Sequence, residues 1–325
     1  MYSVCYVVTD NEKLTYYNEL VISLASLRKH GNDCPVVILT DKSTAAEIRK
    51  QKYDDLGELK AELRVIDAPA SYSQKENSRF IKTSMREYVS GDFLFIDTDT
   101  VIAEPLNLCY NGELALALDY NTDLKGRQEI DDLHNLIQKN KLSGYTLDVA
   151  WPYYNSGCIW AEDTAKVHAF FHQWHEEWKR CRDLGVVVDQ PALNYVNRVM
   201  EGLIQELDGV YNVQISSRVT PINLLHKAKI IHYYNGNFYR IYLLQNPEIR
   251  SLGYKIEDIQ RIISCPKEAF HPSILLTPTK QTSVGPVKDT AIYSAMMRLY
   301  EKHLLLFRIM DYPFSLLRKI RKRIM

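Results

Sequence analysis

The first hundred residues alternate between short apolar runs and segments with a helical repeat. Four mainly apolar runs are too short for ordinary helices and fit strands, and the wholly apolar run at 93–96 fits a strand buried on both faces. These runs are residues 3–9, 36–39, 63–66 and 93–96. The segments between them carry apolar residues at helical spacing, as Leu20, Leu24 and Leu27 do. This alternation predicts an α/β fold with a mostly parallel, twisted sheet flanked by helices.

Two helices of this first half have further sequence signals. Thr44 and Glu47 have the spacing of a capping box, which would start a helix after the second strand. Residues 78–88 have apolar positions on one face and lead directly into the run at 93–96. We therefore expect the 78–88 helix to deliver the chain to the fourth strand.

The pattern becomes less regular after residue 105. Residues 114–118 and 158–160 fit further strands, and we expect residues 121–150 to form a polar, irregular insert between them. A helix is predicted from Thr164, with an aromatic face that belongs in the core, and another after Asp189. Residues 230–234 fit a last strand, and residues 289–311 fit one long helix.

Composition places the chain among globular proteins with a substantial core. Hydrophobic residues make up 46% and charged residues 25% of its 325 positions. No run approaches the roughly 18 consecutive apolar residues that a membrane span requires, and no charged leader precedes an apolar run at the start. The six cysteines include no C-x-x-C pair, which favours buried thiols in a reducing compartment. We therefore expect a cytoplasmic protein.

The net charge of zero hides an uneven distribution. Residues 298–325 hold eight Lys/Arg and two Asp/Glu, so the rest of the chain carries six more acidic than basic groups. Apolar residues such as Phe314 and Leu317 are interleaved with Arg318, Lys319 and the basic residues after them. Near an anionic leaflet each cation contributes about 1 kcal/mol, so the tail predicts peripheral attachment to a membrane. A merely solubilising tail is the alternative, and no motif supports a nucleic-acid partner.

The strongest chemical signal is a pair of acids after the fourth strand. Asp97 and Asp99 are two residues apart in extended chain, so their side chains leave the same side of the backbone. They also follow the carboxyl end of a strand, where open α/β sheets bind ligands. Adjacent carboxylates repel each other unless a cation lies between them, and Mg²⁺ and Mn²⁺ prefer such oxygen ligands. The pair therefore predicts a divalent metal site.

Other interpretations of this pair stay open. The two acids could form a solvated turn. The sequence Asp97-Thr98-Asp99-Thr100-Val101 also fits the nucleophile motif of haloacid-dehalogenase-like phosphatases, with Asp97 as the nucleophile. That enzyme class needs a further acidic pair after a later strand, which we do not find. No G-x-G-x-x-G or G-x-x-x-x-G-K-[ST] follows a strand, so dinucleotide-binding and P-loop readings lose their main support.

Four features in order resemble the GT-A glycosyltransferases. They are the D-x-D pair, the Tyr-Asn-Ser-Gly segment at 154–157 before a strand, Asp189-Gln190 at a helix start, and the late His232. The chain is most similar to the family-8-like members that include glycogenin and bacterial lipooligosaccharide galactosyltransferases. The likeness covers residues 1 to about 240, which we expect to form the GT-A domain, with 241–325 as a helical, basic extension.

The resemblance implies a donor, a metal and their ligands. UDP is the commonest nucleotide of the family's donors, and His232 matches its third metal ligand beside Asp97 and Asp99. Manganese suits a mixed set of carboxylates and imidazole better than magnesium does. Thr9 and Asp10 match the nucleoside pocket, although Asp10 could equally cap a helix.

Further donor contacts are implied by position in the motifs. Lys82 resembles a basic contact to the donor, and Arg79 lies one turn before it; both could instead belong to a solvated helix face. Thr98 and Asn155 lie in two of the matching segments. The family's His-x-x-Gly-x-x-Lys segment is altered here, because Gly236 comes one position late and Arg240 stands as a candidate for the missing lysine.

Asp189 and Gln190 match the residues that the family places beside the anomeric carbon. The family implies transfer with retention, whereas inversion would need a carboxylate base on the opposite face. Asp189 could also be the N-cap of a helix with Pro191 in its first turn. The expected function is metal-dependent transfer of a hexose from a UDP-sugar to a glycan or lipid-linked saccharide. A phosphatase and a catalytically silent glycan-binding scaffold remain alternatives.

Overall fold

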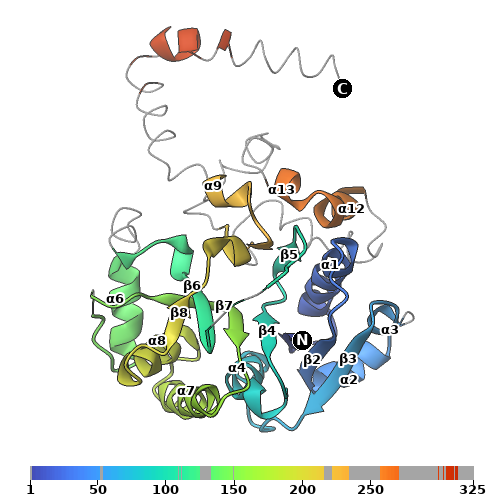
Figure 1. Cartoon of the computed structure of the whole chain (residues 1–325), viewed down its shortest axis with the longest axis vertical. Coiled ribbons are helices and arrows are strands. Elements are labelled where there is room, and N and C mark those ends of the chain that lie inside the picture. Colours follow the sequence, from blue (N-terminus) through green and yellow to red (C-terminus); the bar gives the residue numbers. More distant parts are fainter. Residues whose placement is uncertain are drawn as a thin grey trace.

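The chain folds around one large and one small β-sheet (Figure 1). The structure is a computed structural model, and it describes residues 2–51, 54–108, 110, 112–124, 133–148, 150–215, 222–233, 257–270, 299, 303, 305–310 and 312–313. The seven-stranded sheet has the order β3-β2-β1-β4-β7-β6-β8, and the three-stranded sheet has the order β5-β10-β9. The large sheet consists of β1 (Ser3–Val8), β2 (Val36–Asp41), β3 (Ala61–Ile66), β4 (Phe93–Ile96), β6 (Leu114–Leu118), β7 (Tyr154–Ala161) and β8 (Ile204–Glu206). The small sheet consists of β5 (Thr100–Ile102), β9 (Val213–Gln214) and β10 (Ile230–His232).

The large sheet is mostly parallel, as the sequence predicts. β1 pairs in parallel with β2 and β4, β2 with β3, and β6 with β8, while β7 runs antiparallel between β4 and β6. The chain leaves β1 in one direction through β2 and β3 and then returns to place β4 on the other side of β1. Such a reversal of strand order is where open α/β sheets form their ligand cleft.

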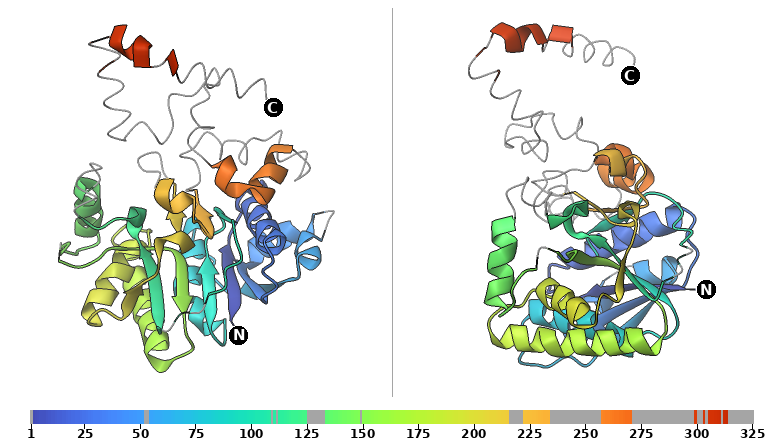
Figure 2. Two further views of the ribbon diagram at one scale, coloured as in Figure 1. Left: turned by 45° about the horizontal axis from the view of Figure 1, so that its top comes forward. Right: turned by 60° about the vertical axis from the view of Figure 1, so that its left-hand side comes forward.

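Helices cover both faces of the large sheet (Figure 2). On one face α4 and α7 pack against alternate strand residues such as Cys5 and Phe95. On the other face α1 packs against the intervening residues, such as Tyr6 and Leu94. The larger helices are α1 (Thr15–Lys29), α2 (Lys42–Arg49), α4 (Gln74–Ser84), α6 (Leu133–Leu142), α7 (Ala165–Asp183), α8 (Gln190–Val199) and α12 (Glu257–Ser264). The short ones are α3 (Asp55–Glu58), α9 (Ile222–Leu225) and α13 (Pro266–Ala269), with 3-10 turns at Met85–Glu87, Asp119–Asn121 and Gly209–Tyr211.

The aromatic face predicted after Thr164 is confirmed as core. Thr164 is the N-cap of α7 and accepts a hydrogen bond from the Val167 amide. Five large side chains of this helix are at most 2% exposed and pack against the sheet: Val167, Phe170, Phe171, Trp174 and Trp178. Their periodicity could be read correctly because all of them face one continuous sheet surface.

Four local predictions were wrong. Thr44 caps nothing, because Asp41 is the N-cap of α2 and its carboxylate accepts from the Thr44 amide. The helix predicted at 78–88 begins earlier, at Gln74, where Ser73 and Glu76 form the capping box. The Tyr-Asn-Ser-Gly segment lies inside β7 and does not precede it. The insert at 121–150 contains α6, whose apolar face is too short for its period to be recognised in a polar segment.

The C-terminal region is described only in part. α12 packs beside α1 and against β5, and the ring of Phe270 stacks on Tyr233 just after β10, with centroids 5.5 Å apart. The predicted domain boundary at residue 240 lies outside the described residues. So does most of the helix predicted over 289–311, of which residues 305–310 are described and helical. In the described part of the chain, no helix combines the length and apolar character needed to cross a bilayer. Cys5, Cys34, Cys158, Cys181 and Cys265 are free thiols.

Candidate functional site

A cleft of about 1000 Å³ opens at the carboxyl ends of β1 and β4. Residues that follow strands form its floor, including Thr9 and Asp10 after β1 and Asp97 to Asp99 after β4. Side chains of α4 and the start of α8 form its wall. The cleft therefore lies at the strand-order reversal, where the fold predicts a ligand site.

Asp97 and Asp99 lie at the junction of the two sheets. The Asp97 amide donates to the carbonyl of Gly157 and so continues the pairing of β4 with β7 in the large sheet. The carbonyl of Asp99 accepts from the Tyr233 amide and so continues the pairing of β5 with β10 in the small sheet. Each acid of the pair is thus fixed by the backbone of a different sheet.

His232 completes a three-residue cluster with the two acids. Its partner in β5 is Thr100, the residue after Asp99, so the strand register places the imidazole beside the acidic pair. One ligand atom from each of Asp97, Asp99 and His232 can be chosen so that all three lie within 4.8 Å of one another. Two carboxylate oxygens and one imidazole nitrogen form a donor set suited to Mn²⁺ or Mg²⁺, with manganese favoured by the nitrogen.

The imidazole of His232 is buried and touches Asp99. Nε2 lies 3.2 Å from Asp99 Oδ1, and the ring is 3% exposed. Burial by itself would lower the pKa of His232, but the charge of Asp99, its hydrogen bond and the charge of Asp97 outweigh this and raise it. Gly157 makes the position possible, since a Cβ there would clash with Cε1 and Nδ1 of the ring.

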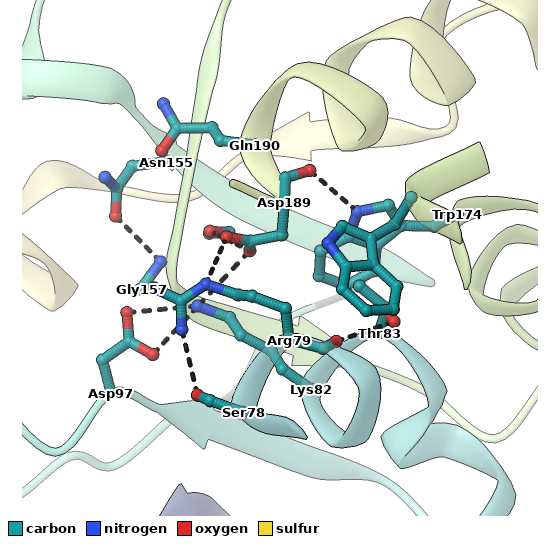
Figure 3. A network of polar contacts seen from close by, with 12 residues as sticks. Ser78, Arg79, Lys82, Thr83, Asp97, Asn155, Gly157, Trp174, Asp189 and Gln190 are labelled. Carbon is teal, nitrogen blue, oxygen red and sulfur yellow. Dashed lines mark hydrogen bonds and ion pairs between the residues drawn. The ribbon is translucent and has the colours of Figure 1, made fainter. Parts of the chain in front are cut away.

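A network of charged groups lies beside this cluster (Figure 3). Lys82 of α4 is 2% exposed, and its Nζ lies 2.9 and 3.2 Å from the two carboxylate oxygens of Asp97. The same ammonium lies 3.6 Å from Asp189 Oδ2, and Arg79 Nε lies 3.0 Å from Asp189 Oδ1. Lys82 and Arg79 therefore face the cleft, and the alternative of a solvated helix face is wrong for both.

Asp189 is held in its ionised form. Burial would raise its pKa, but Lys82, then Arg79 and the hydrogen bond from Ser156 Oγ at 2.8 Å lower the pKa to about 2. Its side chain makes no capping hydrogen bond to α8, although its backbone occupies the N-cap position. Trp174 Nε1 donates to the Asp189 carbonyl and fixes the backbone there (Figure 3).

The predicted nucleoside contacts lie at the end of β1. Thr9 and Asp10 both line the cleft. Asp10 Oδ2 accepts from the Tyr17 amide in the first turn of α1, and Oδ1 accepts from the Asn11 amide. Burial raises the pKa of Asp10, partly offset by these backbone hydrogen bonds. Asp10 therefore stabilises the start of α1, which was the alternative prediction, and also contributes to the floor of the cleft.

The remaining predicted residues divide into two groups. Thr98, Asn155 and Gln190 line the same cleft. Gly236 and Arg240 lie outside the described residues.

Sequence reasoning missed several polar residues of the site. Ser156 contacts Asp189, and it could have been found because it lies within a segment that was already singled out. Asp119 directly follows β6, so the strand-end rule that identified Asp97 applies to it as well. Asn212 hydrogen bonds to His232 from just before β9, and no motif in the sequence indicates this contact.

Comparisons with known proteins agree with the predicted family resemblance. Residues 89–235 match a family model described as nucleotide-diphospho-sugar transferase. A comparison with curated proteins gives no significant match. The crystal structure of the galactosyltransferase LgtC, in complex with donor and acceptor sugar analogs, has 14% identity and a TM-score of 0.50, over 80% of this chain and 99% of that one. The apo form of mouse xyloside xylosyltransferase 1 has 13% identity and a TM-score of 0.46, over 73% of this chain and 98% of that one.

At such identities the structural likeness concerns the fold, while the family match covers the segment that carries the D-x-D pair, Asp189 and His232. The chain thus has the GT-A fold and resembles the family-8-like nucleotide-sugar glycosyltransferases, the group that includes glycogenin and the bacterial lipooligosaccharide galactosyltransferases.

Proposed function

We propose that this nucleotide-sugar glycosyltransferase moves a hexose from a UDP-sugar to a glycan or lipid-linked saccharide acceptor, with Mn²⁺ or Mg²⁺ held by Asp97, Asp99 and His232. The observation that carries the proposal is the placement of these three residues in the floor of the large cleft. A volume of about 1000 Å³ is sufficient for a nucleotide with an attached sugar.

The charges around the cleft suit the departure of a nucleoside diphosphate. Breaking the bond between sugar and phosphate leaves negative charge on the diphosphate. A divalent ion in this site would neutralise that charge as it develops. Lys82 and Arg79 add two fixed positive charges on the adjacent wall, where they would contact the donor.

The state of Asp189 favours transfer with retention. A carboxylate with a pKa of about 2, paired with two cations, is too weak a base to deprotonate a sugar hydroxyl efficiently. It suits the stabilisation of positive charge at the anomeric carbon instead, and Gln190 lines the cleft next to it. Asp189 and Gln190 are therefore the proposed catalytic residues, with Thr9, Asp10, Thr98 and Asn155 as further donor contacts.

The function can be tested without knowing the acceptor. The protein is incubated with a panel of UDP-sugars and Mn²⁺, and free UDP is measured over time. We expect slow hydrolysis of one UDP-sugar, and we expect EDTA to abolish it. Turnover of p-nitrophenyl phosphate without any reaction of UDP-sugars would instead support the phosphatase. No reaction with either substrate would support a catalytically silent glycan-binding scaffold.

Residues 298–325 would hold the enzyme at an anionic membrane surface on the cytoplasmic side. The helical residues 305–310 and Tyr312 expose large apolar side chains, each more than half accessible to solvent: Leu305, Leu306, Ile309, Met310 and Tyr312. Five basic residues follow within the next eleven positions after Tyr312, in a part of the chain that the structure does not describe. Apolar insertion combined with such a cationic segment is a typical means of peripheral attachment.

Truncation after residue 297 should abolish attachment. The full chain is expected to sediment with vesicles that contain phosphatidylserine and to stay in the supernatant with phosphatidylcholine alone. The shortened chain is expected to stay in the supernatant in both cases and to retain hydrolysis of the UDP-sugar. Equal sedimentation of the two proteins with the anionic vesicles would refute this role of the tail.

A further inference from the structure

A chain of buried amide groups ends on the ring of His232. Nδ1 of His232 lies 3.0 Å from Asn212 Oδ1, and Asn212 Nδ2 donates to Asn155 Oδ1 at 2.9 Å. Asn155 Nδ2 in turn donates to Asp119 Oδ1, also at 2.9 Å. None of these four side chains is more than 7% exposed. The chain thus connects the end of β6 to the imidazole through Asn155 and Asn212.

The direction of these hydrogen bonds is fixed by one backbone group. The Gly157 N–H, which can only donate, lies 2.8 Å from the same oxygen of Asn155 that Asn212 contacts (Figure 3). This atom of Asn155 must therefore be the carbonyl oxygen, and the Asn212 atom facing it must be the amide nitrogen. Asn212 then presents its oxygen to His232. The carboxylate of Asp119 agrees with this direction, because an ionised carboxylate only accepts.

An oxygen facing Nδ1 requires that Nδ1 carries the proton. Nε2 faces the carboxylate of Asp99 at 3.2 Å and donates to it, so the metal-free ring carries a proton on each nitrogen. A divalent ion bound at Nε2 would replace the Nε2 proton alone, because the Nδ1–H stays bonded to Asn212. Histidine ligands of metal ions are commonly oriented in this way by an outer hydrogen-bond acceptor. We infer that Asn212 is a positioning residue, which, through the Asp119–Asn155–Asn212 chain, keeps Nε2 of His232 ready to bind the divalent ion. This inference rests on the metal site of the proposed function.

The proton on Nδ1 can be tested in the metal-free protein. Nitrogen-15 spectra of the histidine rings, recorded near neutral pH, distinguish protonated from unprotonated ring nitrogens. His232→Gln assigns the signal. We expect the wild type to show a proton on Nδ1 as well as on Nε2, and Asn212→Leu to show a proton on Nε2 and none on Nδ1. This readout does not depend on metal binding or on activity.

Two substitutions separate the orienting role from a structural one. Asn212→Leu and Asn212→Asp both remove the donor to Asn155, but only the leucine removes the acceptor for Nδ1–H. Mn²⁺ binding is measured by the electron paramagnetic resonance signal of the free ion. We expect the dissociation constant to rise 10- to 100-fold in Asn212→Leu and to stay within about threefold of the wild type in Asn212→Asp, which keeps the acceptor for Nδ1–H that orients the ring.

Asn197→Leu serves as the matched control. Asn197 is also buried, at 2% exposure, but its side chain binds the Ile204 amide away from the cleft. We expect unchanged Mn²⁺ binding in this variant, with circular dichroism confirming that each protein is folded. If Asn212→Leu does not fold, Asn212→Asp alone tests the inference. An acceptor role of residue 212 requires that this variant keeps the proton on Nδ1 and binds Mn²⁺ with near-normal affinity.

The outcomes distinguish the positioning role of Asn212 from the role of His232 as a metal ligand. Unchanged protonation of Nδ1 and unchanged Mn²⁺ affinity in Asn212→Leu, together with weaker Mn²⁺ binding in His232→Ala, would overturn the role of Asn212 and leave the metal site intact. An equal loss of Mn²⁺ affinity in Asn212→Leu and Asn212→Asp would also overturn the role of Asn212 as an acceptor for Nδ1–H. The effect would then come only from the lost hydrogen bond to Asn155. Unchanged Mn²⁺ binding in His232→Ala would instead remove His232 from the ligand set.

Discussion

Replacing Asp99 with asparagine should reduce the hydrolysis of the UDP-sugar by roughly 10²- to 10³-fold. The substitution removes one of the two negative charges that would hold the divalent ion, and it leaves the hydrogen bond from the Tyr233 amide to the Asp99 carbonyl in place. Because the ion would stabilise charge that develops as the diphosphate leaves, the loss should appear in turnover and in Mn²⁺ affinity. A titration of hydrolysis with Mn²⁺ measures both quantities.

Asp92→Asn provides the matched control for this loss. Asp92 directly precedes β4, at the opposite end of the same strand, where its carboxylate accepts from the Asp163 amide. It lies outside the cleft, so we expect turnover and Mn²⁺ dependence to stay near wild-type values. Metal dependence unaltered by Asp99→Asn would exclude Asp99 as a ligand.

Replacing Asp189 with asparagine should lower turnover by about 10²-fold or more while the donor binds almost as before. The negative charge would be lost next to the anomeric carbon, where it acts mainly in the transition state. Stability should fall as well, because the pKa of about 2 lies below the ordinary aspartate value. A carboxylate with a lowered folded-state pKa stabilises the fold above its unfolded pKa, and this contribution is lost as the pH falls towards 2.

Urea unfolding can measure this second effect. At pH 7 we expect the free energy of unfolding of Asp189→Asn to lie about 2 kcal/mol below that of the wild type. At pH 3 the difference should narrow to about half of that value. Asp183→Asn, at the exposed end of α7, should change neither turnover nor stability measurably. Full turnover in a destabilised Asp189→Asn would assign this residue a purely structural role.

The sequence predicts the fold well where one periodicity dominates. The run at 93–96 is short, wholly apolar and followed by polar residues, so its burial and its position before the acidic pair follow directly from the pattern. The aromatic face of α7 is equally clear. α6 was missed because its helix lies in a polar segment with only Leu136 and Asn140 buried, and a weak period cannot be distinguished from a loop.

The residues of the candidate site can be predicted from the sequence where they directly follow a strand. Asp97 was named from its position after a strand, whereas Asp10 and Asp189 were named from the resemblance to the glycosyltransferases, and all three line one cleft. The burial of Lys82 could not be predicted, because a lysine on a helix is normally solvated and the two carboxylates that stabilise it inside come from distant parts of the chain. Contacts such as Asn212 with His232 join residues twenty positions apart through strand register, which one sequence does not reveal.

The junction between β4 and β5 gives the acidic pair a mechanical role. Since the main chain at Asp97 belongs to one sheet and the main chain at Asp99 to the other, an ion shared by their carboxylates would be a removable cross-link between the two sheets. Its occupancy and the rigidity of the small sheet would then be thermodynamically coupled, so that a looser small sheet would bind the ion more weakly. Filling of this site would then stiffen the small sheet, and emptying it would relax that sheet again.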